Sequence, residues 1–197
     1  MSNWYKIAQE EPLPEEGDGT SVTEQWLKNM HELKTRGKTS YQDEFHYKTL
    51  EDFFLQNAKH YQSQPLGEEE LEILNKWKKI TKYYKMKQCF YNAQDLATLS
   101  PRIKYIEGYV STTGIPFPIE HGWNTINDKV IDFTMYHSNN GNPILGIIPE
   151  GWEYYGVQLP TKLITKHWME YETADSLVRD YKSRYPLLRS QFNPEAV

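Results

Sequence analysis

The sequence predicts an α+β fold, because helix patterns and strand patterns occupy separate parts of the chain. Residues 21–80 carry apolar residues at helical spacing, whereas short runs of aromatic and β-branched residues, separated by turn residues, follow at 105–160. Helices alternating with strands would indicate a parallel sheet, whereas separate groups favour an antiparallel sheet with helices packed against it. We therefore expect a helix packed on an antiparallel sheet, with an additional helical N-terminal part.

The chain of 197 residues has the length of one domain with a sizeable core. Residues 1–20 are rich in Pro, Gly and acidic residues, which predicts a flexible tail. Residues 21–197 are expected to form a single domain. Its expected parts are a helical region at 21–80, a core at 85–160 and a C-terminal helical segment at 161–197 that closes the domain.

Three helices are expected before residue 81. Ser21 or Thr23 is the expected N-cap of the first helix, and Gly37 is its expected end. Gly67 opens the third helix, because the three glutamates after it favour the positively polarised end of a helix. The apolar residues that define the helices are Trp26, Met30 and Leu33 in the first, Leu50, Phe53 and Phe54 in the second, and Ile73, Trp77 and Ile80 in the third.

The pattern changes at Cys89. Residues 89–99 carry one face of apolar side chains at helical spacing, and Ser100-Pro101 ends the predicted helix. Asn127-Asp128 is a typical turn pair and predicts two strands joined as a hairpin. The remaining expected elements are strands at 105–110, 121–124, 129–133 and 154–159, loops at 114–118 and 136–143, and a closing helix at 176–185.

Charge and cysteine content argue against several classes of function. The formal net charge of −5 offers no positive surface for nucleic acid or an anionic membrane. A single cysteine allows no internal disulfide and no CxxC metal or redox motif. No apolar run approaches the roughly 20 residues of a membrane span, and the N-terminus lacks the build of a signal peptide. A cytoplasmic protein without a metal or organic cofactor is expected.

The three residues that together indicate chemistry are Cys89, His121 and Asp132. They follow one another at separations of 32 and 11 residues. A thiolate nucleophile, a histidine that takes and returns its proton, and a carboxylate that orients the histidine form a cysteine acyl-transfer site. The spacing permits this arrangement, because 11 residues suffice for a strand, a tight turn and a returning strand.

The expected position of Cys89 at the start of a helix supports the same interpretation. The positively polarised helix end and its free N–H groups favour a thiolate, and a nearby histidine lowers the pKa of the thiol further. The same N–H groups are able to receive the negative oxygen that forms when a carbonyl is attacked.

Four runs of sequence resemble a known family. They are Gln88–Ala93, Tyr105–Tyr109, His121–Asn124 and Val130–Thr134. Together they resemble the transglutaminase-like branch of the papain-like cysteine enzymes, over about residues 85 to 160. In that family a cysteine opens a helix, a histidine lies in an H-x-W strand, and an aspartate lies in a D-x-T strand that follows.

The resemblance implies a papain-like, transglutaminase-like fold with Cys89 as nucleophile, His121 as general base and Asp132 as the orienting acid. Members of the family include proteases, deamidases, amide hydrolases and acyltransferases. The implied reaction is thioester-forming acyl transfer from a protein or peptide, with water or a primary amine as the acceptor. Hydrolysis is favoured, because nothing in the sequence marks an amine site. Two residues depart from the family pattern: Phe90 stands for its usual tryptophan and Gly122 for its common alanine.

Several residues near the triad are candidates for binding substrate or for stabilising the oxyanion. No spacing rule selects among them, and each also has a structural interpretation as a core, turn or strand residue. The candidates are Gln88, Glu107, Trp123 and Asn124, followed by Tyr83, Tyr84 and Asn92.

Two other interpretations stay open. Cys89, His121 and His137, with Asp132, include the donor types of a zinc site, although the sequence lacks the close paired spacing of a strong zinc motif. Alternatively, the chain is a non-catalytic protein-binding module or inhibitor on the same scaffold. The many Tyr and Trp residues and the helical first third suit that alternative.

Overall fold

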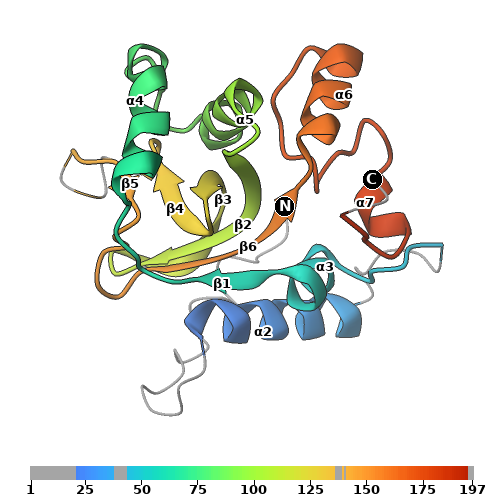
Figure 1. The fold of residues 1–197 in the computed structure, drawn as a ribbon. Coiled ribbons are helices and arrows are strands. Elements are labelled where there is room, and N and C mark those ends of the chain that lie inside the picture. The colour runs from blue at the N-terminus through green and yellow to red at the C-terminus, as the bar shows by residue number, and fades with distance from the viewer. Residues whose placement is uncertain (1–20, 38–43, 136–138, 140, 195–197) are drawn as a thin grey trace.

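The computed structural model describes residues 21–37, 44–135, 139 and 141–194, and these form an α+β fold around a curled antiparallel sheet (Figure 1). The fold class expected from the sequence is confirmed. The helices are α2 (Val22–Arg36), α3 (Leu50–Asn57), α4 (Glu68–Thr81), α5 (Cys89–Leu99), α6 (Thr161–Tyr171) and α7 (Pro186–Arg189). The strands are β1 (Lys59–Tyr61), β2 (Lys104–Thr112), β3 (Ile115–Ile126), β4 (Lys129–Asp132), β5 (Ile144–Leu145) and β6 (Glu153–Leu159).

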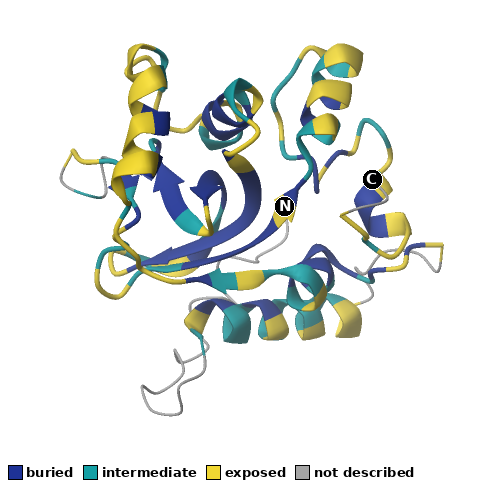
Figure 2. Cartoon of the chain, viewed as in Figure 1, coloured by how far each residue is buried: buried dark blue, intermediate teal, exposed yellow. Residues whose placement is uncertain are grey.

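The six strands lie in the order β1-β6-β2-β3-β4-β5, and every neighbouring pair is antiparallel. Figure 1 shows α4, α5 and α6 on one side of the sheet and α2 and α3 on the other. Both faces of the central strands are therefore covered, and β2 is buried from Tyr105 to Thr112 (Figure 2). Among the described residues, no helix is long and apolar enough to cross a membrane.

The predicted helix starts in the first third are confirmed by their caps. Ser21 is the N-cap of α2, and its hydroxyl accepts a hydrogen bond from the N–H of Glu24 at 3.2 Å. The carboxylate of Glu70 accepts the N–H of Gly67 at 2.6 Å where α4 begins. Both contacts satisfy N–H groups that have no partner within the helix.

The β3–β4 hairpin brings the predicted histidine and aspartate strands together. Asn127 and Asp128 form its turn with φ angles of 51° and 63°, the left-handed values that a type I′ hairpin turn requires. The register pairs Asn124 with Ile131. This hairpin confirms the turn expected at Asn127-Asp128.

Two expected elements are wrong. Residues 115–118 were expected in a loop but form the start of strand β3. Among the described residues, this part of β3 pairs with β2 on one side and has no strand on the other, because β4 pairs with residues 124–126 of β3. The prolines that suggested a loop are tolerated there, since a strand edge needs no N–H. Residues 176–185, expected to be helical, form turns, with Arg184 and Tyr185 at φ of 58° and 56°.

The short strands β1 and β5 were not predicted, whereas α6 and α7 lie within the segment at 161–197 that was expected to be helical, although no bounds were expected for them. The expected tail at 1–20 and part of the expected loop at 136–143 lie outside the described residues.

The close approach of β2 and β6 generates a prediction about stability. A Cβ at Gly108 would overlap the backbone of Tyr155 and Gly156, neither of which is able to move without breaking the sheet. We expect Gly108→Ala to lower the free energy of unfolding by about 1–3 kcal/mol or more, measured by urea denaturation. Gly114→Ala is the matched control, because nothing lies within 4 Å of its Cβ position. Equal stability of the two variants would contradict this packing.

Candidate active site

Cys89 is the first residue of α5, and its partly exposed thiol lines an open cleft of about 660 Å³. Gln88 occupies the N-cap position and also lines the cleft. The cleft runs between the end of α4, the α4–α5 loop, the start of α5 and the segment at 174–175. A substrate in this cleft would meet the thiol at the positively polarised end of a helix.

His121 on β3 and Asp132 on β4 form a buried pair across the hairpin. The Nε2 of His121 lies 2.7 Å from Oδ2 of Asp132, and the two side chains are 3% and 1% exposed. Asp132 also accepts hydrogen bonds from the hydroxyl of Tyr154 at 2.9 Å and from the backbone N–H groups of Thr134 and Met135 at 2.7 and 3.1 Å. These four donors fix the carboxylate, and through it the imidazole ring.

The pair holds opposite charges. Burial alone would lower the pKa of His121, but the charge of Asp132 and hydrogen bonds with Asp132 and Cys89 raise it to about 10. Burial opposes ionisation of Asp132 as well, yet His121 and the N–H donors bring the pKa of this carboxyl below its usual value. At neutral pH the histidine is therefore an imidazolium beside a carboxylate.

The thiol of Cys89 completes the arrangement. Burial would raise the pKa of Cys89, but a hydrogen bond and the charge of His121, together with the N–H groups of Gly122 and Phe90, lower it below its ordinary value. Since Nε2 of His121 is engaged by Asp132, Nδ1 is the ring nitrogen available to the sulfur. The structure thus brings the three predicted residues together in the order thiol, imidazole, carboxylate.

Gly122 sets how closely α5 approaches β3. A Cβ at this position would lie 2.9 Å from Cδ1 of Phe90 and 3.4 Å from the carbonyl oxygen of Cys89. The glycine therefore lets the start of α5 reach the strand and brings its own N–H to the sulfur. Asn124 fixes the same contact further along, where its Nδ2 donates to the carbonyls of Ala93 and Lys104 at 2.8 and 3.2 Å.

Of the seven substrate or oxyanion candidates, Tyr83, Tyr84 and Gln88 line the cleft. The side-chain amide of Asn92 instead donates to the carbonyl of Lys85 at 2.8 Å and to the hydroxyl of Thr134 at 2.9 Å. Glu107, Trp123 and Asn124 are 1%, 1% and 3% exposed. Trp123 packs behind the histidine, its ring stacked on that of His121 with centroids 6.3 Å apart. These three residues are buried within the fold, so in this structure they do not contact a substrate in the cleft.

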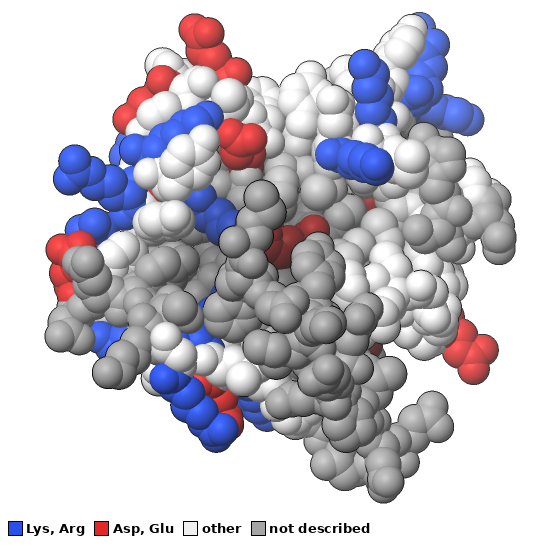
Figure 3. Space-filling view, turned by 180° about the vertical axis from the view of Figure 1, so that it is seen from behind, with Lys and Arg blue, Asp and Glu red and all other residues white. Residues whose placement is uncertain are grey.

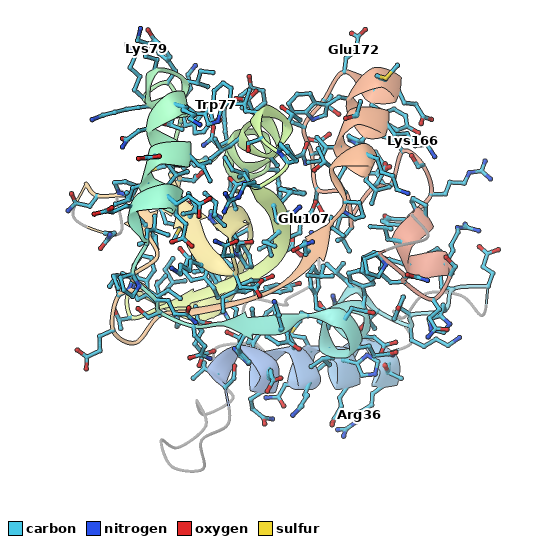
Figure 4. The ribbon with its side chains drawn as sticks, in the orientation of Figure 1. Arg36, Trp77, Lys79, Glu107, Lys166 and Glu172 are labelled. Atoms are coloured by element: carbon cyan, nitrogen blue, oxygen red, sulfur yellow. The ribbon has the colours of Figure 1, made fainter. Side chains whose placement is uncertain are left out.

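Glu107 anchors the wall of the cleft opposite α4. Its carboxylate accepts hydrogen bonds from the hydroxyls of Tyr105 and Ser176 and from the N–H groups of Leu177 and Val178, at 2.6 to 3.2 Å. Burial raises the pKa of this carboxyl although those hydrogen bonds oppose the rise. Figure 4 shows Glu107 in the interior between the sheet, α5 and α6. The interpretation of Glu107 as a residue that binds substrate is corrected accordingly.

Two residues that shape the site were not identified from the sequence. Gln94 on α5 links the helix to the same wall, because its Nε2 donates to the carbonyl of Asp175 at 2.7 Å and its Oε1 accepts the indole N–H of Trp168 at 2.7 Å. Tyr154 reaches Asp132 from β6. The strand pattern of 154–159 was visible in the sequence, but its contact with Asp132 depends on the curl of the sheet.

No metal cluster exists in the described part of the chain, where no group of three or more His, Cys, Asp or Glu side chains is placed to hold an ion. His137, the additional donor considered for zinc, lies outside the described residues.

Comparison of the chain with models of protein families, with curated proteins and with solved structures finds no match. The chemistry of the site is therefore inferred from its own geometry.

The charge state of the site predicts the pH dependence of thiol alkylation. Because the pKa of Cys89 is lowered and that of His121 is raised to about 10, a thiolate–imidazolium pair persists between the two values. Alkylation by iodoacetamide should therefore stay fast at pH values below the range in which an ordinary cysteine titrates, and it should rise again near pH 10. In His121→Ala the fast alkylation at low pH should vanish. The rate should then follow a single titration of the Cys89 thiol, at or above the free-cysteine pKa of about 8.5.

Rates measured by mass spectrometry across this pH range check the prediction. The exposed His46→Ala is the control, and its profile should match the wild type. A single titration at the free-cysteine value in the wild-type protein would contradict a thiolate–imidazolium pair.

The buried Glu107 carboxylate predicts a second, structural effect. Each of its oxygens accepts two hydrogen bonds, so the amide of Glu107→Gln would place an NH₂ group against two donors. We expect a loss of about 1.5–3 kcal/mol in the free energy of unfolding and faster proteolysis within 174–185. The exposed Glu172→Gln is the matched control and should behave as the wild type. Unchanged protease resistance in Glu107→Gln would show that this carboxylate does not hold the wall.

Proposed function

We propose that the chain is a cysteine-dependent acyl-transfer enzyme that hydrolyses an amide or peptide bond through Cys89, His121 and Asp132. The observation that carries the proposal is the buried His121, which bridges the thiol of Cys89 and the carboxylate of Asp132 beside an open cleft. This constellation agrees with the resemblance to the transglutaminase-like branch of the papain-like cysteine enzymes. The antiparallel sheet and the helix that begins at the cysteine are also compatible with a papain-like fold.

In the first half-reaction the thiolate of Cys89 adds to the carbonyl carbon, and the carbonyl oxygen becomes an oxyanion. The oxyanion then collapses, the C–N bond breaks, and the imidazolium of His121 gives its proton to the leaving amine. A thioester and a neutral imidazole remain. The backbone N–H of Cys89 at the helix start and the side-chain amide of Gln88 in the cleft are the donors proposed for the oxyanion.

In the second half-reaction His121 takes a proton from water, and the resulting hydroxide attacks the thioester. The C–S bond breaks, a carboxylic acid leaves, and the thiolate–imidazolium pair forms again. Asp132 keeps one tautomer and one ring orientation of His121 throughout, and its negative charge stabilises the imidazolium. A primary amine in place of water would give a transamidated product by the same steps.

The reaction predicts losses that differ among the triad residues. Cys89→Ala should abolish turnover of peptide and glutamine amides, whereas the isosteric Asp132→Asn should lower kcat by a much smaller factor, because an amide oxygen still accepts from His121 but its missing charge no longer stabilises the imidazolium. Activity is measured as new carboxylate that carries oxygen from ¹⁸O-labelled water. A urea denaturation curve for each variant verifies that the fold is intact.

Addition of a primary amine distinguishes hydrolysis from transfer. Hydrolysis as the main reaction predicts that carboxylate stays the main product in the presence of the amine. Turnover that survives Cys89→Ala would refute the proposed mechanism. Main formation of the amine adduct would keep the triad but change the acceptor.

A further inference from the structure

A concentrated run of lysines precedes the cysteine. Six of the 22 Lys and Arg residues of the chain lie within residues 76–87, and no Asp or Glu lies among them although the chain holds 27 acidic residues. Seen from behind, basic side chains gather at the end of α4, at the upper right of Figure 3, with no acidic side chain among them. The six lysines are Lys76, Lys78, Lys79, Lys82, Lys85 and Lys87.

Three of these lysines, Lys79, Lys85 and Lys87, line the cleft that holds Cys89. Among the ion pairs of the described residues, none involves these three side chains. Of the two acidic residues of the cleft, Asp175 pairs with Lys182 at 3.1 Å, whereas Asp95 accepts the hydroxyl of Tyr84 at 2.9 Å, a neutral donor that does not cancel the charge of a carboxylate. Three lysines face this one carboxylate, so the cleft carries an excess of positive charge.

Helix stability explains only part of this charge. Lys78 and Lys79 lie in the last turn of α4, where cations are favourable near the negatively polarised end. Lys85 and Lys87 lie beyond the helix and gain nothing from it. Lys87 is moreover exposed and has a φ of 64°, a left-handed conformation that glycine or asparagine adopts at lower cost. Packing does not account for a lysine at that position.

We infer that the cleft binds an acidic segment of a polypeptide, whose carboxylates face Lys79, Lys85 and Lys87 while one of its amide carbonyls lies at Cys89. This inference rests on the proposed acyl-transfer function, because that chemistry needs a carbonyl and a nucleic acid offers none of suitable reactivity. The exposed rings of Tyr83 and Tyr91, 71% and 48% exposed, supply apolar contact surface along the same cleft.

A pair of small alkylating reagents tests the charge of the cleft without any substrate. Iodoacetamide is neutral and iodoacetate is anionic, and with both the thiolate displaces iodide as the C–S bond forms. At Cys89 the rate constant for iodoacetate is divided by the rate constant for iodoacetamide. This ratio, divided by the same ratio for 2-mercaptoethanol, reports the local potential at the sulfur. We expect this normalised ratio to exceed one at about 0.01 M ionic strength and to approach one at about 1 M, where the Debye length falls from about 30 to about 3 Å.

The triple variant Lys79→Gln, Lys85→Gln, Lys87→Gln should lower the ratio at low ionic strength by roughly threefold to tenfold. Its matched control is Lys28→Gln, Lys162→Gln, Lys166→Gln, which changes the net charge equally at exposed sites on α2 and α6. Figure 4 shows Lys79 at the outer end of α4 and Lys166 on α6, well apart. The control variant should leave the normalised ratio unchanged. An equal fall of the ratio in both variants would contradict the claim that the cleft lysines act locally on Cys89.

A pair of peptidyl acyloxymethyl ketones then tests the peptide itself. The two differ only in three glutamates or three glutamines, and with both the thiolate displaces the carboxylate leaving group. The acidic peptide should inactivate Cys89 faster at low ionic strength, and the cleft variant should remove that preference. Equal rates for the two peptides would overturn the inference. Protection of Cys89 by a single-stranded oligonucleotide as strong as that by the acidic peptide would also overturn it, because the cleft would then bind any polyanion.

Failure of the inference is distinguishable from failure of the proposed function. Iodoacetamide alone reports whether the thiol is activated, since the reagent has no charge. Fast alkylation by iodoacetamide, together with a normalised ratio of one at all ionic strengths, would leave the enzyme proposal intact. It would overturn the inference that the cleft binds an acidic segment. Slow alkylation of Cys89 by iodoacetamide at neutral pH would contradict the enzyme proposal directly.

Discussion

The buried carboxylate of Asp132 is the constraint on which the geometry of the site depends. A buried charge without partners costs several kcal/mol, so its donors must converge on it when the chain folds. Those donors come from β3, from β6 and from the residues that follow β4. β6 lies three strand spacings from β4, about 14 Å on a flat sheet, and side chains stand nearly perpendicular to a sheet. The hydrogen bond from Tyr154 to Asp132 therefore requires the curl that the sheet shows, and the same curl surrounds His121 with protein.

A second buried carboxylate, Glu107, organises the other side of the cleft. It binds the hydroxyl and backbone N–H groups at 176–178, and Gln94 holds the adjoining carbonyl of Asp175. One carboxylate thus orients the imidazole, while the other holds the wall against which a substrate would lie. Both bind backbone N–H groups outside helices and strands, which turns irregular segments into fixed parts of the structure. Such segments otherwise have few contacts to hold them.

The parts that the sequence predicts are those with local causes. The helix starts follow from caps three residues long, and the hairpin follows from Asn127-Asp128, so the triad emerged from chain order and short-range spacing. The expected helix at 176–185 is replaced by turns, in which Arg184 and Tyr185 adopt left-handed φ angles of 58° and 56° and Glu107, about 70 residues earlier, binds the N–H groups of Leu177 and Val178. β1 and β5 are three and two residues long and are defined only by their partners. Contacts of this kind leave no pattern within the segment itself.

Two sources of positive charge act at Cys89, and their physical properties separate them. His121 is buried and hydrogen-bonded to the sulfur, so solvent ions screen its charge very little. The cleft lysines are exposed, so their influence on an approaching anion falls steeply as ionic strength rises. Ionisation of the thiol should therefore depend on the imidazole, whereas the choice between charged and neutral acyl donors should depend on the lysines. Salt then changes the selectivity of the site and leaves its nucleophile almost unaffected, because the two functions rest on charges at different depths.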